Sequence, residues 1–285
     1  MNICLTGNSF QPISKDGLVT GYNVAAADLV SSFFRYSKAE RLICLYEPWQ
    51  DRLNTLKEMA GNSERIQFIS EYELLFRGVK ILPQVDILHS VKEDAIPLLS
   101  MRENIKSDIP ITFTIHGMAE QHLIMDFFYP MLFLPFKPYD AVICTSETVR
   151  RTIENMFSRM EDMLNRTLPL SSPLKHQIRL EKVPLGVDTS YYRPMDQIKC
   201  RKEFGFDAED IIILWFGRFS DLFKADLYPL LHVFRKLLMQ NKDKRLRLVL
   251  SGSQEPGTDY AGKIYAEARH MGIDDFVKII FHHEI

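Results

Sequence analysis

IIILWFGRFSDLFKAD, residues 211–226, is the most informative stretch of this chain. Its first six residues are all apolar, which is typical of a parallel strand that is covered on both faces. Gly217 and Arg218 follow at once, and Lys224 comes six positions later, just before a helical pattern that begins near residue 225. The pattern predicts a buried strand, a loop that bears two cations, and a helix.

The position of these cations indicates what the loop could bind. A strand-to-helix loop at the carboxyl edge of a parallel sheet is a common anion site, because helix N–H groups and the positive end of the helix dipole point there. Arg218 and Lys224 would add charge-assisted hydrogen bonds to a diphosphate and neutralise it as a leaving group. The alternative is that both are solvated cations paired with Asp221 and Asp226. Spacing alone leaves both interpretations open.

The same strand opens a series of alternating elements that runs to the last residues. We expect strands at 211–216, 247–250 and 277–281, with helices at 225–240 and 258–270 between them. This is one βαβαβ unit, whereas a doubly wound nucleotide domain contains two. If 211–216 is a central strand, nothing later in the sequence pairs with its far side, which leaves a long apolar edge of the kind that proteins avoid. We therefore expect either a truncated chain or a partner over that edge.

Upstream, another series of short β-rich runs alternates with helical patterns. The expected strands are 2–6, 41–46, 65–69, 85–88, 110–115, 141–144 and 178–182, and the clearest helices are 22–36 and 147–160, the latter with Ser146 as its N-cap. Such alternation predicts an α/β fold with a parallel sheet covered on both faces. Residues 183–194, VPLGVDTSYYRP, contain two prolines and a glycine and are typical of an interdomain connection. We expect domains at 1–190 and 191–285.

Composition excludes several classes of protein. The net charge of -2 comes from interleaved acids and bases, so it indicates neither nucleic acid nor anionic lipid as a partner. The four cysteines lack metal or redox spacing, and three lie in apolar runs, which favours a reducing, cytoplasmic setting. The start of the chain has no export signal, and the longest apolar stretch, 123–136, is too short for a membrane span. The aromatic segment 122–136 could make peripheral membrane contact, but core packing or an interdomain surface is favoured.

Together, 183–194 and 211–231 resemble the interdomain segment and donor loop of retaining glycosyltransferases of family 4. Members typically show a proline, Asn-Gly-Val-Asp, an aromatic residue and Arg-Pro, and about twenty residues later Gly-Arg, a spacer and a lysine. The residues kept here are Pro184, Gly186, Val187, Asp188, Tyr192, Arg193, Pro194, Gly217, Arg218 and Lys224. Leu185 stands where asparagine is usual, and the spacer before Lys224 is one residue longer than in the commonest members.

This resemblance implies a GT-B fold with a complete Rossmann-like acceptor-side domain and the first βαβαβ half of a nucleotide-sugar-binding domain. It implies transfer of a hexose from a nucleotide diphosphate sugar, a co-substrate, to a carbohydrate or other hydroxyl acceptor, with retention at the anomeric carbon. Gly217, Arg218 and Lys224 would hold the donor diphosphate, so neither a metal nor another cofactor is implied. The family's Glu-x7-Glu element has no counterpart in this sequence. We expect little or no activity from this chain; the alternative is a non-catalytic short product that acts as a binding or interaction protein.

Further site residues are expected on both domains. The resemblance places Ser251 and Gly252, in SGSQEPG, and His282 near the nucleotide base, although an ordinary strand-to-helix turn would look the same. Metal binding by His282 and its neighbour His283 is not indicated without more ligands. Glycines before the first helix, Gly17 and Gly21, would let a phosphate or an acceptor approach backbone N–H groups, or they are turn glycines.

His116 directly follows the strand at 110–115 and is the candidate catalytic residue. A histidine there could bind a sugar hydroxyl or stabilise charge at the anomeric carbon, or its ring could be satisfied by local backbone. His89, which follows the preceding strand, is a weaker candidate of the same kind.

Two other enzyme classes fit poorly. Glu47 lies where a dinucleotide fold keeps its ribose-binding acid, but TGNSFQ is not G-x-G-x-x-G, which argues against a nicotinamide enzyme. The sequence also lacks the G-x-S-x-G elbow of serine hydrolases.

Overall fold

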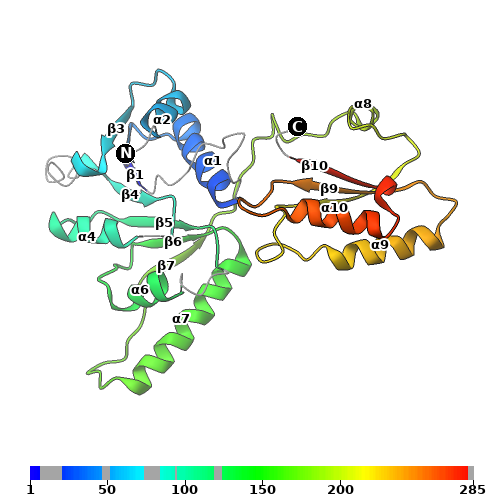
Figure 1. The fold of residues 1–285 in the computed structure, drawn as a ribbon. Coiled ribbons are helices and arrows are strands. Elements are labelled where there is room, and N and C mark those ends of the chain that lie inside the picture. The colour runs from blue at the N-terminus through cyan, green and yellow to red at the C-terminus, as the bar shows by residue number, and fades with distance from the viewer. Residues whose placement is uncertain (7–20, 47–51, 74–83, 94, 119–123, 282–285) are drawn as a thin grey trace. The chain divides into compact units, whose positions relative to one another are not determined.

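The computed structural model describes residues 1–6, 21–46, 52–73, 84–93, 95–118 and 124–281. The chain divides into two compact units (Figure 1). The described residues of the first unit end at Val187, and the second unit continues from Asp188.

The first unit is built on one parallel sheet of seven strands. These are β1 (Asn2–Thr6), β2 (Arg41–Tyr46), β3 (Ile66–Ser70), β4 (Ile87–Ser90), β5 (Ile111–Ile115), β6 (Ala141–Cys144) and β7 (Arg179–Lys182). Their order is β3-β2-β1-β4-β5-β6-β7, with every pair parallel. The order reverses between β1 and β4, which is the switch point where Rossmann-like sheets bind ligands. The expected α/β fold is confirmed.

Helices cover both faces of this sheet. They are α1 (Gly21–Tyr36), α2 (Arg52–Ala60), α4 (Ile96–Asn104), the π-helix η2 (Ile124–Phe128), α6 (Tyr129–Phe133) and α7 (Glu147–Thr167). Alternate strand residues enter opposite cores: Leu42 packs in the cluster with α1 and α2, while Ile43 packs in the cluster with α4, α6 and α7. Burial on both faces explains why these strands read as continuous apolar runs.

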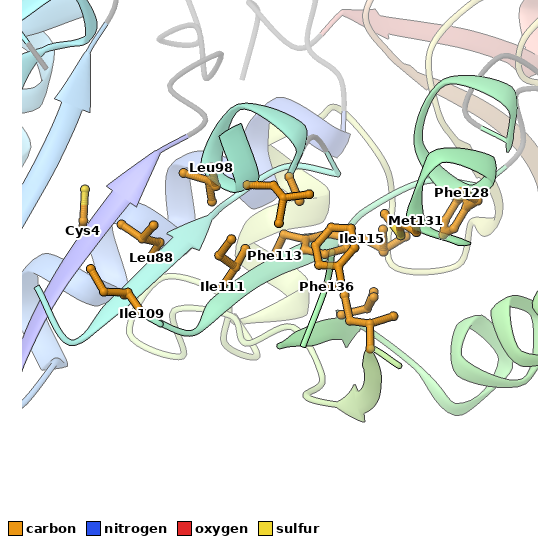
Figure 2. Close-up of a cluster of buried hydrophobic side chains, with 14 of the residues drawn as sticks. Cys4, Leu88, Leu98, Ile109, Ile111, Phe113, Ile115, Phe128, Met131 and Phe136 are labelled. Carbon is orange, nitrogen blue, oxygen red and sulfur yellow. The ribbon is translucent and has the colours of Figure 1, made fainter. Parts of the chain in front are cut away.

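The segment after residue 123 is part of the larger core. Phe128, Met131 and Phe136 are buried beside the central strand residues Phe113 and Ile115 (Figure 2). The favoured interpretation of this aromatic stretch as core packing is therefore confirmed for these side chains. Among the described residues, no helix combines the length and apolar character that crossing a bilayer requires.

Two elements of the first unit end at least two residues later than expected. Helix α7 begins where Ser146 caps it, with Ser146 Oγ accepting from Val149 N at 3.1 Å, but it runs to Thr167 and not to residue 160. The apolar stripe simply continues, because Leu164 packs against the same core as Met160. Strand β4 ends at Ser90, two residues later than expected, because polar His89 and Ser90 are buried and still pair with β1.

A buried ion pair joins α4 to the start of β6. The Arg102 guanidinium donates to both carboxylate oxygens of Asp140, at 2.8 and 2.9 Å, and neither side chain is exposed. Asp140 also accepts from the backbone N–H groups of Ile111 and Lys137, each at 2.8 Å. The carboxylate thus holds three segments of the chain together.

The second unit has the expected βαβαβ order. It contains α8 (Gln197–Glu203), β8 (Ile211–Phe216), α9 (Tyr228–Gln240), β9 (Leu246–Gly252), α10 (Tyr260–His270), the 3-10 helix η3 (Asp274–Phe276) and β10 (Val277–Phe281). The sheet is parallel, in the order β10-β9-β8. Helices α9 and α10 lie on the same side of it (Figure 1) and pack against Ile213 and Trp215 of β8.

For β8 the sequence predicted burial on both faces, and it predicted that no later strand pairs with its far side. In the described residues the first expectation is wrong and the second is confirmed. Within them β8 pairs only with β9 and lies at the edge of the sheet. Leu214 is 60% exposed and Phe216 is 77% exposed. Since α9 and α10 cover the face that carries Ile213 and Trp215, the alternate side chains are left uncovered.

Candidate functional site

The carboxyl ends of β8 and β9 lie side by side and form the base of the candidate donor site. Gly217 follows β8, and its N–H donates to Ser251 O at 2.9 Å. Gly252 ends β9, and a Cβ atom there would lie 1.7 Å from Gly217 O. Only a residue without a side chain fits this approach, which is a structural reason for the glycine at 252.

A turn, and not a helix, carries Lys224. Ser220 O accepts from the N–H groups of both Lys224 and Ala225, and Ser220 Oγ accepts from Phe223 N. Helix α9 begins only at Tyr228, so its expected start near residue 225 is wrong. The buried serine provides the reason, because it satisfies the backbone donors that would otherwise open the helix.

The two cations differ in their surroundings. The Arg218 side chain is only 14% exposed, and its Nε lies 3.0 Å from Glu255 Oε2. Lys224 is exposed. Among the described residues the ion-pair partner of Arg218 is therefore Glu255, and not Asp221 or Asp226 as the alternative interpretation expected. Glu255 lies in SGSQEPG, at the same sheet edge one strand later, and that shared edge is the sequence signal that points to it.

The residues expected at the nucleotide base are only partly described. Ser251 is 5% exposed and lies within β9, where its carbonyl accepts from Gly217 N. The loop after Gly252 is held to α10, because Gln254 donates to Thr258 O at 3.0 Å and accepts from Ala261 N. His282 lies outside the described residues.

In the first unit, His116 is held at the end of β5. Its Nε2 lies 2.9 Å from Val91 O, so this nitrogen donates and the neutral ring keeps its lone pair on Nδ1. Nδ1 is buried and has no hydrogen-bond partner among the described residues. The ring of Tyr22 meets the His116 ring edge-on at 5.4 Å. One ring nitrogen is thus satisfied by the backbone, and the other has no hydrogen-bond partner among the described residues.

Glu93 completes this cluster and was not anticipated from the sequence. It is 6% exposed, and Oε1 accepts from His116 N at 2.8 Å and from Gly117 N at 3.2 Å. Glu93 follows β4, the neighbour of β5, so strand order brings it to His116 although 23 positions separate them. The carboxylate sets the backbone from which the His116 ring projects.

The remaining candidate residues are Gly21, Gly17 and His89. Gly21 is the first residue of α1, and a Cβ atom there would meet no described atom within 4 Å. Gly17 lies outside the described residues. His89 Nδ1 is bonded to Thr112 Oγ1 at 2.8 Å, and burial, with a smaller contribution from His116, lowers the pKa of His89 to about 4.

The cysteines behave as buried apolar residues. Cys4, Cys44 and Cys144 are buried, while Cys200 is partly buried. Burial raises the pKa of Cys44 to about 12 and that of Cys144 to about 11. In the described part of the chain, no three His, Cys, Asp or Glu side chains gather in a way that could hold a metal ion.

A comparison with protein-family models finds no match. A D-inositol 3-phosphate glycosyltransferase from Frankia alni is 32% identical over 103 residues, which is 35% of this chain and 25% of that protein. One of the same name from Nocardioides sp. is 30% identical over 99 residues, 34% of this chain and 21% of that protein. The matched stretches therefore span a quarter of these relatives or less.

Solved structures match over almost the whole chain. A trehalose-6-phosphate synthase has a TM-score of 0.56 at 12% identity, over 99% of this chain and 74% of that chain. A glycosyltransferase from Rickettsia africae also gives 0.56, at 13% identity, over 98% of this chain and 67% of that chain. An E. coli structure described as trehalose-6-phosphate bound with UDP-2-fluoro glucose gives 0.53, at 13% identity, over 99% and 73%.

The chain has a GT-B-like fold. At these identities the structural likeness establishes the architecture alone. The sequence relatives match about a third of the chain, and both are named as glycosyltransferases. Within the GT-B-like chain, the Arg218 loop follows a strand of the second unit and the His116 cluster follows a strand of the first.

Proposed function

We propose that this chain is part of a retaining glycosyltransferase of the family 4 type. It would transfer a hexose from a nucleotide diphosphate sugar to a hydroxyl group of an acceptor. The glycosyltransferase names of the sequence relatives and the GT-B-like fold support this class of reaction. The motif running from Pro184 to Lys224 supports the narrower family.

The proposal rests mainly on the position of Arg218 and on the free Nη groups of its guanidinium. It follows β8 at the carboxyl edge of a parallel sheet, and its Nη atoms make no hydrogen bond to any described residue. A guanidinium with a free pair of Nη groups suits two oxygens of a diphosphate. The exposed Lys224 on the neighbouring turn would add a second positive charge.

In the proposed reaction, these two cations stabilise the departing nucleotide diphosphate. As the bond from the anomeric carbon to the diphosphate oxygen breaks, negative charge grows on the leaving group, and fixed cations lower the free energy of that state. Because Arg218 and Lys224 supply this charge, the proposed transfer is metal-independent. Nucleotide binding that persists in excess EDTA is the expected result.

His116 is proposed to bind a sugar hydroxyl through Nδ1. Its Nε2 already donates to Val91 O, so Nδ1 can only accept in the neutral ring. A sugar hydroxyl is a suitable hydrogen-bond donor for this atom. In this role His116 orients the sugar and does not transfer a proton.

The test is a titration of the 285-residue protein with UDP, GDP and ADP by calorimetry. We expect one nucleotide to bind measurably, and Arg218→Ala to weaken it by about 10- to 100-fold, the value of a charge-assisted hydrogen bond. Lys224→Ala should weaken it less, since Lys224 is more solvated. The control is Lys242→Ala, an exposed cation in the same unit. Equal affinities for wild type and Arg218→Ala, or no binding at all, would refute the donor-site assignment.

Stereochemistry and turnover need separate measurements. In an extended chain that contains the glutamate element, NMR of the product should show the same anomeric configuration as the donor. The 285-residue chain itself is expected to turn over weakly or not at all. Inversion at the anomeric carbon would remove the family 4 assignment while leaving nucleotide binding intact.

A further inference from the structure

Glu255 makes a close contact with Arg218 that the diphosphate assignment does not explain. Glu255 Oε2 lies 3.0 Å from Arg218 Nε, and the two side chains are 19% and 14% exposed. Both contacting atoms are buried, and their geometry is not that of an aligned hydrogen bond. The contact is therefore an ion pair shielded from water at its centre.

The backbone brings these two residues together. Beyond the ends of β8 and β9, Phe219 N donates to Ser253 O at 2.8 Å and Glu255 N donates to Phe219 O at 3.3 Å. Phe219 and Gln254 form a parallel bridge, which extends the strand pairing into the two loops. Arg218 and Glu255 flank this bridge. Strand register thus brings the two residues within reach of each other's side chains.

The loop that carries Glu255 is also anchored on its other side. Gln254 donates to both Thr258 O and Thr258 Oγ1, at 3.0 and 2.8 Å, and accepts from Ala261 N. Thr258 N in turn donates to Glu255 O. These bonds tie the loop to the first residues of α10, so the carboxylate has a fixed base.

The contact engages only one edge of the guanidinium. Arg218 Nε faces Glu255, and the Phe223 ring centroid lies 6.0 Å from Arg218 Cζ. Within the described part of the chain neither Nη atom donates a hydrogen bond. An arginine held at Nε with both Nη groups open is arranged to accept an anion at its other edge.

We propose that Glu255 is a positioning residue that holds Arg218 ready for the donor diphosphate. This inference rests on the proposed function. Ordering an arginine side chain on binding costs conformational entropy. A residue that orders the side chain beforehand removes this cost from the binding step. Glu255 does so from the Nε edge, which leaves the Nη groups for phosphate oxygens.

If Glu255 competed with the ligand for Arg218, its removal would change the affinity in the opposite direction, so the inference can be tested. A carboxylate beside a phosphate site repels the ligand, so a competing Glu255 would weaken binding, and its removal would tighten binding. A positioning Glu255 strengthens binding, and its removal weakens it. The sign of the change in affinity decides between the two roles.

The experiment measures the affinity of the 285-residue protein for the best binder among UDP, GDP and ADP. We expect Glu255→Ala to weaken it by about 3- to 10-fold, the range for one side chain that must be ordered on binding. Glu255→Gln keeps the shape of the side chain but removes its charge, so it should weaken binding too, because the contact is an ion pair and not an aligned hydrogen bond. Glu209→Ala, which removes an exposed carboxylate in the same unit, is the matched control and should bind like wild type.

A double variant tests whether Glu255 acts through Arg218. In Arg218→Ala the substitution Glu255→Ala should not weaken binding further, since there is no guanidinium left to position. Glu255→Ala that binds as tightly as wild type or tighter, or that still weakens binding in the Arg218→Ala background, would overturn the inference. If instead Arg218→Ala alone binds like wild type, the donor-site proposal fails first. Thermal unfolding of each variant checks that the fold is intact.

Discussion

Gly217 and Gly252 touch at the point where two neighbouring strands end. A Cβ atom at 252 would lie 1.7 Å from Gly217 O and 2.6 Å from Gly217 C, so any side chain there forces the backbone of the Arg218 loop to move. The candidate donor site therefore depends on a contact between two residues that carry no functional group.

The first prediction follows from this contact. Gly252→Ala should lower the free energy of unfolding by about 1–3 kcal/mol, as overpacking does, because the Cβ atom cannot be accommodated without a backbone shift. It should also weaken nucleotide binding, since Arg218 follows Gly217 directly. Urea denaturation and calorimetry measure the two effects. Gly186→Ala, where a Cβ atom meets no described atom within 4 Å, is the control, and equal losses in both variants would contradict the prediction.

The second prediction concerns the buried pair of Arg102 and Asp140. Asp140→Asn should lower the free energy of unfolding by about 3–5 kcal/mol, because it leaves the Arg102 charge buried without a counter-charge. Chemical denaturation of the 285-residue protein measures the change. Glu154→Gln breaks a solvent-exposed pair with Arg150 and should cost less than about 1 kcal/mol. Similar losses of unfolding free energy in the two variants would show that burial does not decide how much an ion pair contributes to stability.

The third prediction concerns stability at acidic pH. Burial lowers the pKa of His89 from 6.5 to about 4, so between these values an unfolded chain binds a proton that the native chain does not. The free energy of unfolding should therefore fall as the pH drops from 6.5 towards 4, with His89 contributing about 3 kcal/mol in total.

Urea denaturation at several pH values in this window measures that contribution. His89→Asn keeps a polar group near Thr112 but does not titrate, so its stability should depend less steeply on pH than that of wild type. Parallel pH profiles for the two proteins would refute the assignment to His89.

The fourth prediction concerns the tautomer of His116. Since Val91 O can only accept, the neutral ring should carry its proton on Nε2 and leave Nδ1 bare. Long-range proton–nitrogen NMR distinguishes the two ring nitrogens directly. A protonated Nδ1 in the neutral ring would exclude the proposed hydrogen bond from a sugar hydroxyl. His270, an exposed histidine in the second unit, provides a reference signal.

The strands were predictable because their signal is local. A parallel strand buried on both faces must be apolar at nearly every position, and runs such as 2–6 and 41–46 carry that pattern within six residues. The placement of Arg218 just past a strand followed from the same pattern. The exposure of Leu214 did not, because whether a strand is central depends on neighbours and not on its own residues.

The local sequence pattern does not predict residues that contact the candidate site residues from a neighbouring strand. Glu255 meets Arg218, and Glu93 meets His116, only because strand order and register bring the ends of adjacent strands together. The predicted start of α9 is wrong for a related reason. The buried Ser220 accepts hydrogen bonds from backbone N–H groups in a turn that helical periodicity does not reveal.

The sequence by itself determined the type and order of the strands and of the longer helices, and which candidate side chains follow which strands. Those properties depend on residues close together in the chain. Only the tertiary structure decided which charge pairs with Arg218, which nitrogen of His116 is already occupied, and why position 252 must be glycine. Each of these is a contact of a few ångströms between segments joined by strand register, and such contacts exist only once the sheets have formed.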